Sequence, residues 1–165
     1  MLKILKKLFF DANFQRKKSF LRSLSLFKDL RDRELALLAQ ALHVRTYHPG
    51  EVVFMEGDIG RALFILETGK VELTRVGHEG KQEPVYTVQP EEFFGEMALL
   101  EQLPRTATAT AAERSHLYLL YRPKLDSLMS RQPRIGAFIM GHLATLLSAR
   151  LRRVSARPLT AAPRA

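Results

Sequence analysis

The most informative stretch of the sequence is FGEMALL at residues 94–100, followed after four residues by RTAT at residues 105–108. Gly95 has no Cβ, so the backbone there can approach a ligand closely. The carboxylate of Glu96 can accept hydrogen bonds from a sugar hydroxyl. The guanidinium of Arg105 is a planar, permanently charged donor that matches two oxygens of a phosphate. These three residue types, so close together in the chain, predict a site for a sugar that carries a phosphate.

The residues between Glu96 and Arg105 predict how these groups are held. Residues 96–100 have the pattern of a short helical turn, whose free N–H groups and positive dipole end attract an anion. Pro104 cannot continue that turn, so the chain must leave it there. Thr106 adds a hydroxyl beside Arg105. The pattern therefore predicts a phosphate cradle built from backbone amides and one arginine.

Three patterns upstream stand in the order that is typical of one protein family. They are Pro49-Gly50-Glu51, Glu56-Gly57-Asp58 and Leu66-Glu67-Thr68-Gly69-Lys70-Val71. Together with residues 94–108, they make the chain similar to the cyclic nucleotide-binding domain family, of the cAMP receptor protein and protein kinase regulatory subunit type. The similarity extends over about residues 20 to 155. It implies a mainly β fold: an antiparallel β jelly roll with N-terminal helices and C-terminal lid helices.

The resemblance also implies a role for the residues of the stretch. Glu96 is expected to bind the ribose 2′-hydroxyl and Arg105 the cyclic phosphate, while Thr106 touches the phosphate or the base. Gly95 is expected to let the backbone approach the ligand. The backbone that completes the phosphate cradle is expected around three further positions: Met97, Ala98 and Ala107. The apolar walls for ribose and purine are expected from three side chains: Phe94, Tyr86 and Val88.

The identity of the base depends on Thr106. In the family's cyclic-GMP-dependent kinases a threonine directly after the arginine helps to recognise guanine, whereas ion-channel relatives with a hydroxyl residue there respond to cyclic AMP. Thr106 therefore admits cyclic GMP without requiring it, and we expect cyclic AMP. The alternative is a silent scaffold in which Glu96 and Arg105 pair with each other and no ligand binds. The sequence holds no nucleophile–base pair and no metal-ligand cluster, so we expect no catalysis, metal or cofactor besides the nucleotide ligand.

The spacing of apolar residues predicts the elements of the fold. After Val44, short segments rich in β-branched and aromatic residues alternate with Gly and Pro, which is typical of strands. The predicted strands are residues 52–55, 62–66, 71–76, 85–88, 106–112 and 117–121. Helical spacing occurs at residues 32–42, 124–129 and 134–154. We therefore expect one domain at 19–157, with helices in 19–42, a jelly roll in 43–121, helices in 122–154 and a short tail at 158–165.

The last predicted helix, residues 134–154, is the expected moving part. Members of the family signal when the C-terminal helix closes over the bound base. Three residues of this helix are the candidate capping contacts: Ile139, Met140 and Leu143. Met140, Leu147 and Val154 are also seven residues apart, which suits a contact between two helices. The apolar stripe is therefore open to three interpretations: a lid, part of the core, or the seam of a homodimer.

Composition narrows the class of protein. The chain has no cysteine, which excludes disulfides and zinc–thiolate sites. No apolar run approaches the length that spans a bilayer. The N-terminus lacks the long apolar core and small-residue cleavage site of a signal peptide. We therefore expect a cytoplasmic protein, at most peripheral to a membrane.

The net charge of +9 is concentrated at the two ends of the chain. Residues 1–33 and 131–165 each carry +7, and residues 34–130 carry −5. Residues 1–18 alternate apolar and basic side chains, which suits a helix on an anionic membrane or in a partner's groove, or a short helix packed on the domain. The alternative function is therefore an interaction protein whose basic N- and C-terminal segments bind an anionic membrane or nucleic acid.

The end of the sequence bears on the output of a sensor. Eleven residues follow Val154, and Pro158 and Pro163 lie among them, so no helix-turn-helix DNA-binding domain fits there. From this we expect a stand-alone sensor that passes its signal to an effector protein, which the sequence does not identify.

Overall fold

The computed structural model describes residues 12–77, 80–101 and 103–155, without the side chains of residues 98, 99, 153 and 154. Most of the predicted basic segment at residues 1–18 and the whole tail at 158–165 lie outside the described residues. Of the predicted seam, the side chain of Val154 lies outside them as well. Within the described part, no helix combines the length and the apolar character that crossing a membrane requires.

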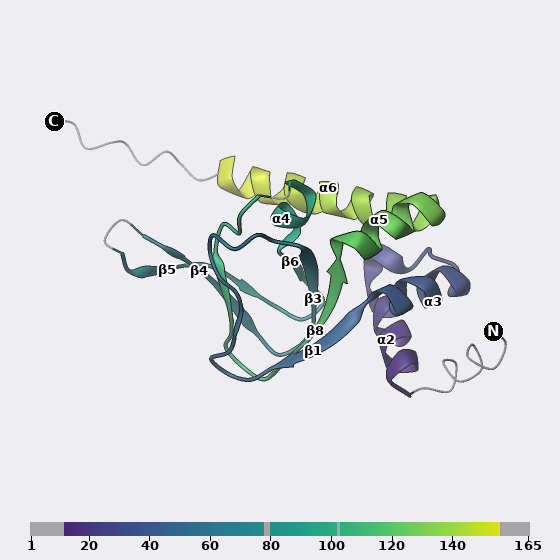
Figure 1. Cartoon of the computed structure of the whole chain (residues 1–165), viewed down its shortest axis with the longest axis horizontal. Helices are drawn as coiled ribbons and strands as arrows, with labels where there is room; N and C mark the ends of the chain where they lie inside the picture. The colour runs from purple at the N-terminus through teal and green to yellow at the C-terminus, as the bar shows by residue number, and fades with distance from the viewer. Residues whose placement is uncertain (1–11, 78–79, 102, 156–165) are drawn as a thin grey trace.

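The described residues form two antiparallel sheets of four strands each, which confirms the predicted jelly roll (Figure 1). The order in the first sheet is β1 (His43–Tyr47), β8 (Ser115–Tyr121), β3 (Ala62–Thr68) and β6 (Phe93–Phe94). The order in the second is β2 (Val52–Phe54), β7 (Thr108–Ala111), β4 (Val71–Val76) and β5 (Gln82–Val88). The β4–β5 hairpin extends away from the rest of the domain, at the left of Figure 1.

Strand β3 separates the two halves of the hydrophobic core. Successive side chains of a strand point to opposite faces. Leu63 and Ile65 therefore pack against the helices, while Phe64 and Leu66 pack between the two sheets. Because both faces are covered, this strand is a continuous apolar run in the sequence rather than an alternating one.

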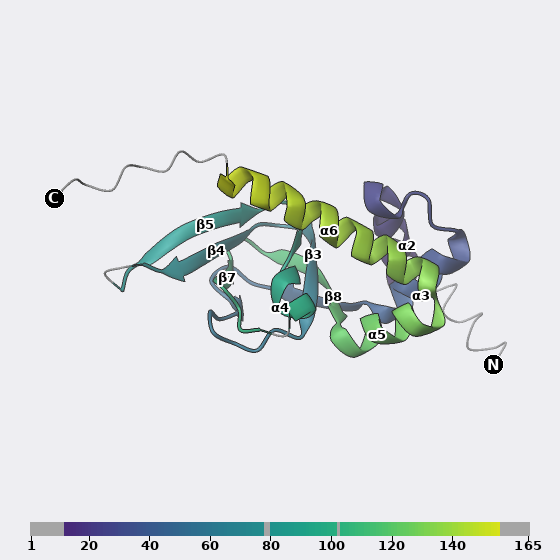
Figure 2. The same ribbon diagram turned by 90° about the horizontal axis from the view of Figure 1, so that it is seen from above.

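Helices cover the outer face of the first sheet. They are α2 (Ala12–Ser23), the 3₁₀ turn η1 (Ser25–Phe27), α3 (Asp32–Ala41), α5 (Arg122–Arg131) and α6 (Pro133–Ser155). Figures 1 and 2 show α2, α3 and α5 gathered at one end of the sheets, with α6 running from that end towards the β4–β5 hairpin. The C-terminal half of α6 therefore lies over the sheets.

The first turn of α6 is attached to the N-terminal helices through Glu34 of α3. The carboxylate of Glu34 is buried and accepts a hydrogen bond from the backbone N–H of Arg31 at 2.7 Å. Arg134 of α6 donates to the same carboxylate at 3.3 Å and to the carbonyl of Asp29 at 3.2 Å. This network attaches the first turn of α6 to α3 and to the turn before it.

The first strand was not predicted from the sequence. Val44 in β1 is 54% exposed, so the segment lacks the apolar signal of a buried strand. It is a strand because its residues pair in antiparallel register with β8, from His43 opposite Leu119 to Tyr47 opposite Ser115. That pairing joins distant parts of the chain and is not visible in local sequence.

Candidate functional site

Gly95 joins β6 to the short helix α4 (Glu96–Glu101) in a conformation that favours glycine. Its φ angle is +75°, in the left-handed region. A Cβ built at this position would lie 2.6 Å from Nη1 of Arg105 and 3.2 Å from the ring of Phe64. Both the backbone angle and the available space therefore require glycine, whereas the close approach of a ligand to Gly95 stays a prediction.

Glu96 is the first residue of α4, and its side chain is 1% exposed. One carboxylate oxygen, Oε1, accepts a hydrogen bond from Arg150 of α6. The other, Oε2, is buried and has no hydrogen-bond partner among the described residues. A buried carboxylate oxygen without a partner is costly, so this atom is an acceptor that is available to a ligand.

Arg105 is buried beneath the same turn. Its Nη1 donates to the carbonyl of Gly95 at 2.6 Å, and its Nη2 donates to the carbonyl of Ala62 at 2.9 Å. The guanidinium lies over the ring of Phe54, 4.2 Å from its centroid, and 5.4 Å from that of Phe64. Burial lowers the pKa of Arg105, while the nearby carboxylate of Glu96 acts in the opposite direction. The Nε–H is buried and has no partner within the described part of the chain.

The turn between β2 and β3 holds the backbone of Arg105 by hydrogen bonds. The N–H of Arg105 donates to the carbonyl of Asp58 at 2.8 Å, and the N–H of Gly57 donates to the carbonyl of Arg105 at 2.9 Å. Next to them, Ile59 and Pro104 form an isolated antiparallel bridge. The carboxylate of Asp58 accepts from the N–H of Met55 at 2.9 Å, which closes this turn. The Glu56-Gly57-Asp58 pattern therefore has a structural role at the site.

Arg150, near the end of α6, brings the C-terminal helix to the site. Besides its ion pair with Glu96, it donates from Nη2 to the carbonyl of Phe93 at 3.0 Å. Glu96 and Arg105 therefore do not neutralise each other in the way that the silent-scaffold alternative supposed. Glu96 pairs with Arg150, and Arg105 is held by two backbone carbonyls.

These groups surround a small pocket of about 60 Å³. Its lining combines the residues of the predicted stretch with others: Phe54, Leu73, Gly95, Glu96, Met97, Arg105, Thr106, Ala107 and Arg150. Sites for small organic ligands have volumes of roughly 300–1,000 Å³. The pocket is therefore too small for a nucleotide while Arg150 holds its wall in place.

The other predicted pocket residues lie elsewhere. Phe94 and Val88 are each fully buried between the sheets, where the ring of Phe94 stacks on that of Phe64 with centroids 5.1 Å apart. The hydroxyl of Tyr86 donates to Glu92 at 2.6 Å, and Tyr86 lines a different cavity beneath α6. Ala98 lies in α4, and its side chain is not among those described.

The candidate lid residues lie in the core rather than at the pocket. Ile139 and Leu143 are 2% and 1% exposed and pack with the N-terminal helices and the first sheet. Met140 is half-buried against the same cluster. The α6 residue that lines the pocket is Arg150, seven residues or about two turns beyond Leu143.

Three pocket residues were missed by sequence reasoning: Phe54, Leu73 and Arg150. Phe54 and Leu73 lie on β2 and β4 and look like any core strand residue in the sequence. In the sequence, Arg150 is one of several arginines on the last predicted helix, and no local pattern distinguishes it from the others. Over the described residues, no three His, Asp or Glu side chains come together as a metal site.

Comparison with known proteins gives a family match at the same residues. Residues 44–132 match the family model described as "Cyclic nucleotide-binding domain". The chain is 36% identical over 127 residues to the cyclic AMP receptor protein of Thermus thermophilus, covering 77% of this chain and 57% of that protein. It is 32% identical over 139 residues to mouse cGMP-dependent protein kinase 2, covering 82% of this chain and 18% of the kinase.

A solved structure gives the same result for the fold. The cyclic nucleotide-binding domain from Methylobacillus flagellatus has a TM-score of 0.77 and 25% identity, covering 88% of this chain and 82% of that one. Domains with this fold are regulatory rather than catalytic. The chain spans little more than half of the Thermus protein and less than a fifth of the kinase. From the match across residues 44–132, the chain belongs to the cyclic nucleotide-binding domain family.

Proposed function

We propose that this chain binds a 3′,5′-cyclic nucleotide in the pocket between α4, Arg105 and α6. The observation that carries the proposal is a pair of buried atoms that have no hydrogen-bond partner among the described residues, Oε2 of Glu96 and Nε of Arg105. The first is an acceptor that suits a ribose hydroxyl, and the second is a charged donor that suits a phosphate oxygen. Burial strengthens both interactions because the local dielectric constant is low.

The phosphate is expected next to Arg105 and the first turn of α4. Arg105 lines the pocket and carries a permanent positive charge. This charge favours an anion such as a cyclic phosphate. Met97 and Ala107 line the pocket, which supports the proposal that their backbone completes the cradle.

For the base, we propose cyclic AMP, with cyclic GMP as the alternative. Thr106 is exposed and lines the pocket, so its hydroxyl is available to either purine. Similar proteins include one named for cyclic AMP and one named for cyclic GMP. The ratio of the two affinities decides between them.

Occupancy of the pocket is proposed to pass to a partner through α6. The nucleotide needs more room than the pocket now has, so Arg150 must leave its contacts with Glu96 and Phe93 when the ligand enters. The ligand then shifts the position of α6 by as much as its affinity differs between the two positions. An effector protein would read the position of the helix.

A second copy of the chain is a further candidate for the surface of α6. Leu151 is 67% exposed, and Leu147, one turn earlier, is half-buried. These residues keep the homodimer interpretation open as a proposal. Sedimentation of the wild type and of Leu151→Glu tests this interpretation. A wild-type dimer that becomes a monomer in Leu151→Glu supports it, and a wild-type monomer at micromolar concentration contradicts it.

The cysteine-free sequence supports a cytoplasmic location.

Calorimetric titration with cyclic AMP and cyclic GMP tests the proposed function. Arg105→Ala should lose about 2–5 kcal/mol of binding free energy, because an anion loses its partner in a buried site. That loss corresponds to roughly a 30- to several-thousand-fold weaker affinity. Arg114→Ala is the matched control, since Arg114 is exposed and does not line the pocket. No heat with either nucleotide, from protein freed of retained ligand, would contradict the proposal.

A further inference from the structure

The ring of Phe54 covers one face of the Arg105 guanidinium. Phe54 is the last residue of β2, is half-buried and lines the pocket at Arg105. The Cζ atom of Arg105 lies over this ring, 4.2 Å from its centroid. The same atom is 5.4 Å from the centroid of Phe64, which is buried in the core between the sheets. The nearer of the two rings therefore belongs to a residue of the pocket.

Two backbone carbonyls hold the guanidinium of Arg105 within its own plane. Nη1 donates to the carbonyl of Gly95 at 2.6 Å, and Nη2 donates to the carbonyl of Ala62 at 2.9 Å. Because the donors of a guanidinium lie in one plane, these bonds still allow the group to rock about the line that joins the two carbonyls. A ring that is packed on the face of the guanidinium opposes this movement. Phe54 therefore restricts the direction that the hydrogen bonds leave open.

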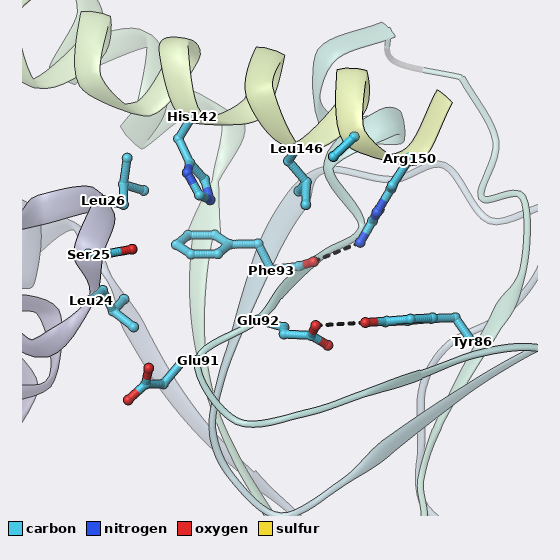
Figure 3. Close-up of a pocket in the computed structure, with 11 residues that line it drawn as sticks. Leu24, Ser25, Leu26, Tyr86, Glu91, Glu92, Phe93, His142, Leu146 and Arg150 are labelled. Carbon is cyan, nitrogen blue, oxygen red and sulfur yellow. Dashed lines mark hydrogen bonds between the residues drawn. The ribbon is translucent and has the colours of Figure 1, made fainter. Parts of the chain in front are cut away.

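The charge of Arg105 is balanced without a carboxylate contact among the described residues. The carboxylates whose charge acts on it are those of Glu96 and Asp58. Glu96 pairs with Arg150, which also donates to the carbonyl of Phe93 (Figure 3). The carboxylate of Asp58 closes its own turn. The negative face of an aromatic ring attracts a cation, most strongly away from water, so the ring on the guanidinium supplies part of the missing compensation.

The surrounding residues fix the ring of Phe54 in place. Its centroid lies 5.4 Å from that of Phe64 and 6.0 Å from that of Phe94, so two core rings support it. In the neighbouring strand β7, Phe54 lies opposite Ala109, which is buried. Residues directly opposite in a sheet share a face, and the small side chain of alanine leaves room for the ring. The support for Arg105 is therefore already in place in this structure.

We propose that Phe54 is a positioning residue for phosphate binding, whose ring holds the guanidinium of Arg105 in the orientation that presents its Nε–H to the ligand. The inference rests on the proposed function, because Phe54 acts through a phosphate that Arg105 binds. A guanidinium that is held in advance spares the ligand the entropic cost of ordering it. Leucine at this position keeps an apolar side chain but has no aromatic face.

Nuclear magnetic resonance of the isotope-labelled full chain, freed of retained nucleotide, tests the contact without a ligand. The Nε–H signal of Arg105, assigned by its loss in Arg105→Lys, should be shifted upfield by the ring current of Phe54. The shift should disappear in Phe54→Leu. It should remain in Phe20→Leu, the same change at a half-buried ring of α2 that does not line the pocket. A signal that Phe54→Leu leaves unchanged would overturn the proposal.

Calorimetric titration with cyclic AMP tests the effect on binding. Phe54→Leu should weaken the affinity about 5- to 30-fold, the range expected for a partly desolvated cation–π contact. Phe20→Leu should bind as the wild type does. Equal affinities of Phe54→Leu and the wild type would contradict the role of the ring.

Trifluorophenylalanine, introduced at position 54 alone, separates the charge of the ring face from its shape. The fluorinated ring packs almost as phenylalanine does, but its face is far less negative, so binding of cyclic AMP should weaken here too. The same residue at position 20 is the control and should leave binding unchanged. This pair also provides the test if Phe54→Leu fails to fold. Wild-type affinity with the fluorinated ring at position 54 would reduce Phe54 to a packing residue and overturn the proposal.

The outcomes distinguish this inference from the proposed function. A wild-type protein that binds no cyclic nucleotide contradicts the proposed function and, with it, the role of Phe54. Nucleotide binding that is lost in Arg105→Ala but unaffected by Phe54→Leu contradicts only the inference.

Discussion

Arg150 of α6 donates a hydrogen bond to the buried carboxylate of Glu96 at the start of α4, and the two residues are 54 positions apart in the sequence. The same guanidinium also donates to the carbonyl of Phe93, directly before the Phe94-Gly95 step that leads into α4. One side chain thus ties the C-terminal helix to both ends of the turn that holds the candidate site. In the proposed function, this contact connects the ligand with the helix.

Arg150→Ala should lower stability and raise affinity for cyclic AMP. It leaves a buried carboxylate without its cation, which costs about 1–3 kcal/mol, less than for a fully buried pair because Arg150 is itself one-third exposed. The melting temperature should therefore fall by about 3–10 °C. The nucleotide no longer has to displace the contact, so calorimetry should show tighter binding. Arg152→Ala, which removes an exposed arginine of the same helix, is the control. Weaker binding by Arg150→Ala would mean that Arg150 holds the ligand instead of excluding it.

Gly95→Ala should damage both stability and nucleotide binding. The new Cβ would meet Nη1 of Arg105 at 2.6 Å in a backbone conformation with φ of +75°. Strain of this kind costs about 1–3 kcal/mol, and Arg105 must move as well. Gly50→Ala is the matched control, because Gly50 has a φ of +84° but nothing within 4 Å of its Cβ position. Thermal unfolding and calorimetry of both variants separate backbone strain from the clash. Equal effects of the two variants on nucleotide binding would rule out the clash as the cause.

Glu96→Gln should weaken binding of cyclic AMP more than binding of its 2′-deoxy analogue. The proposed role of Glu96 is to accept the 2′-hydroxyl, and the analogue lacks that group. Removing a hydrogen bond to a charged group costs about 1.5–3 kcal/mol, or roughly 10- to 150-fold in affinity. The wild type should bind cyclic AMP roughly 10- to 150-fold more tightly than the 2′-deoxy analogue. Glu96→Gln should bind the two ligands with nearly equal affinity. If the variant discriminates between the ligands as well as the wild type does, the ribose is not at Glu96.

His142 should make the protein less stable in mild acid. Burial lowers the pKa of His142 below its usual value of 6.5. The folded state therefore binds this proton less readily than the unfolded state, and stability rises with pH between the two pKa values. The contribution is complete above about pH 6.5 and declines as the pH falls towards the lowered pKa. Thermal unfolding at pH 7.5 and 5.5 should show a smaller loss of stability in acid for His142→Phe than for the wild type. An identical loss in both proteins would mean that His142 is not the group responsible.

Much of the site could be predicted because its parts are close in sequence. Gly95, Glu96 and Arg105 lie in one short stretch of the chain, so their proximity was visible in the sequence. The left-handed φ of Gly95, the helical turn that begins at Glu96 and the end of that turn before Pro104 follow from neighbouring residues. The core strands could be predicted for a similar reason, because an apolar run such as β3 can be recognised in the sequence whatever it packs against.

The position of Tyr86 depends on long-range pairing. Tyr86 in β5 lies directly opposite Leu73 in β4, which lines the pocket at Arg105. The hydroxyl of Tyr86 donates to Glu92, and Tyr86 lines the cavity beneath α6 rather than the small pocket. The hydrogen bond joins β5 to the turn before β6, and no local pattern in the sequence predicts it.

The family and the jelly roll could be predicted from the sequence, because the motifs that carry the resemblance and the apolar strand runs are continuous stretches of chain. The pairing of Arg150 rather than Arg105 with Glu96, and the burial of Ile139 and Leu143 in the core instead of at the pocket, appear only in the folded domain. Those outcomes depend on where α6 crosses the sheets. That position is set by packing over the whole domain and by the contact of Arg134 with Glu34, which are interactions between residues far apart in the chain.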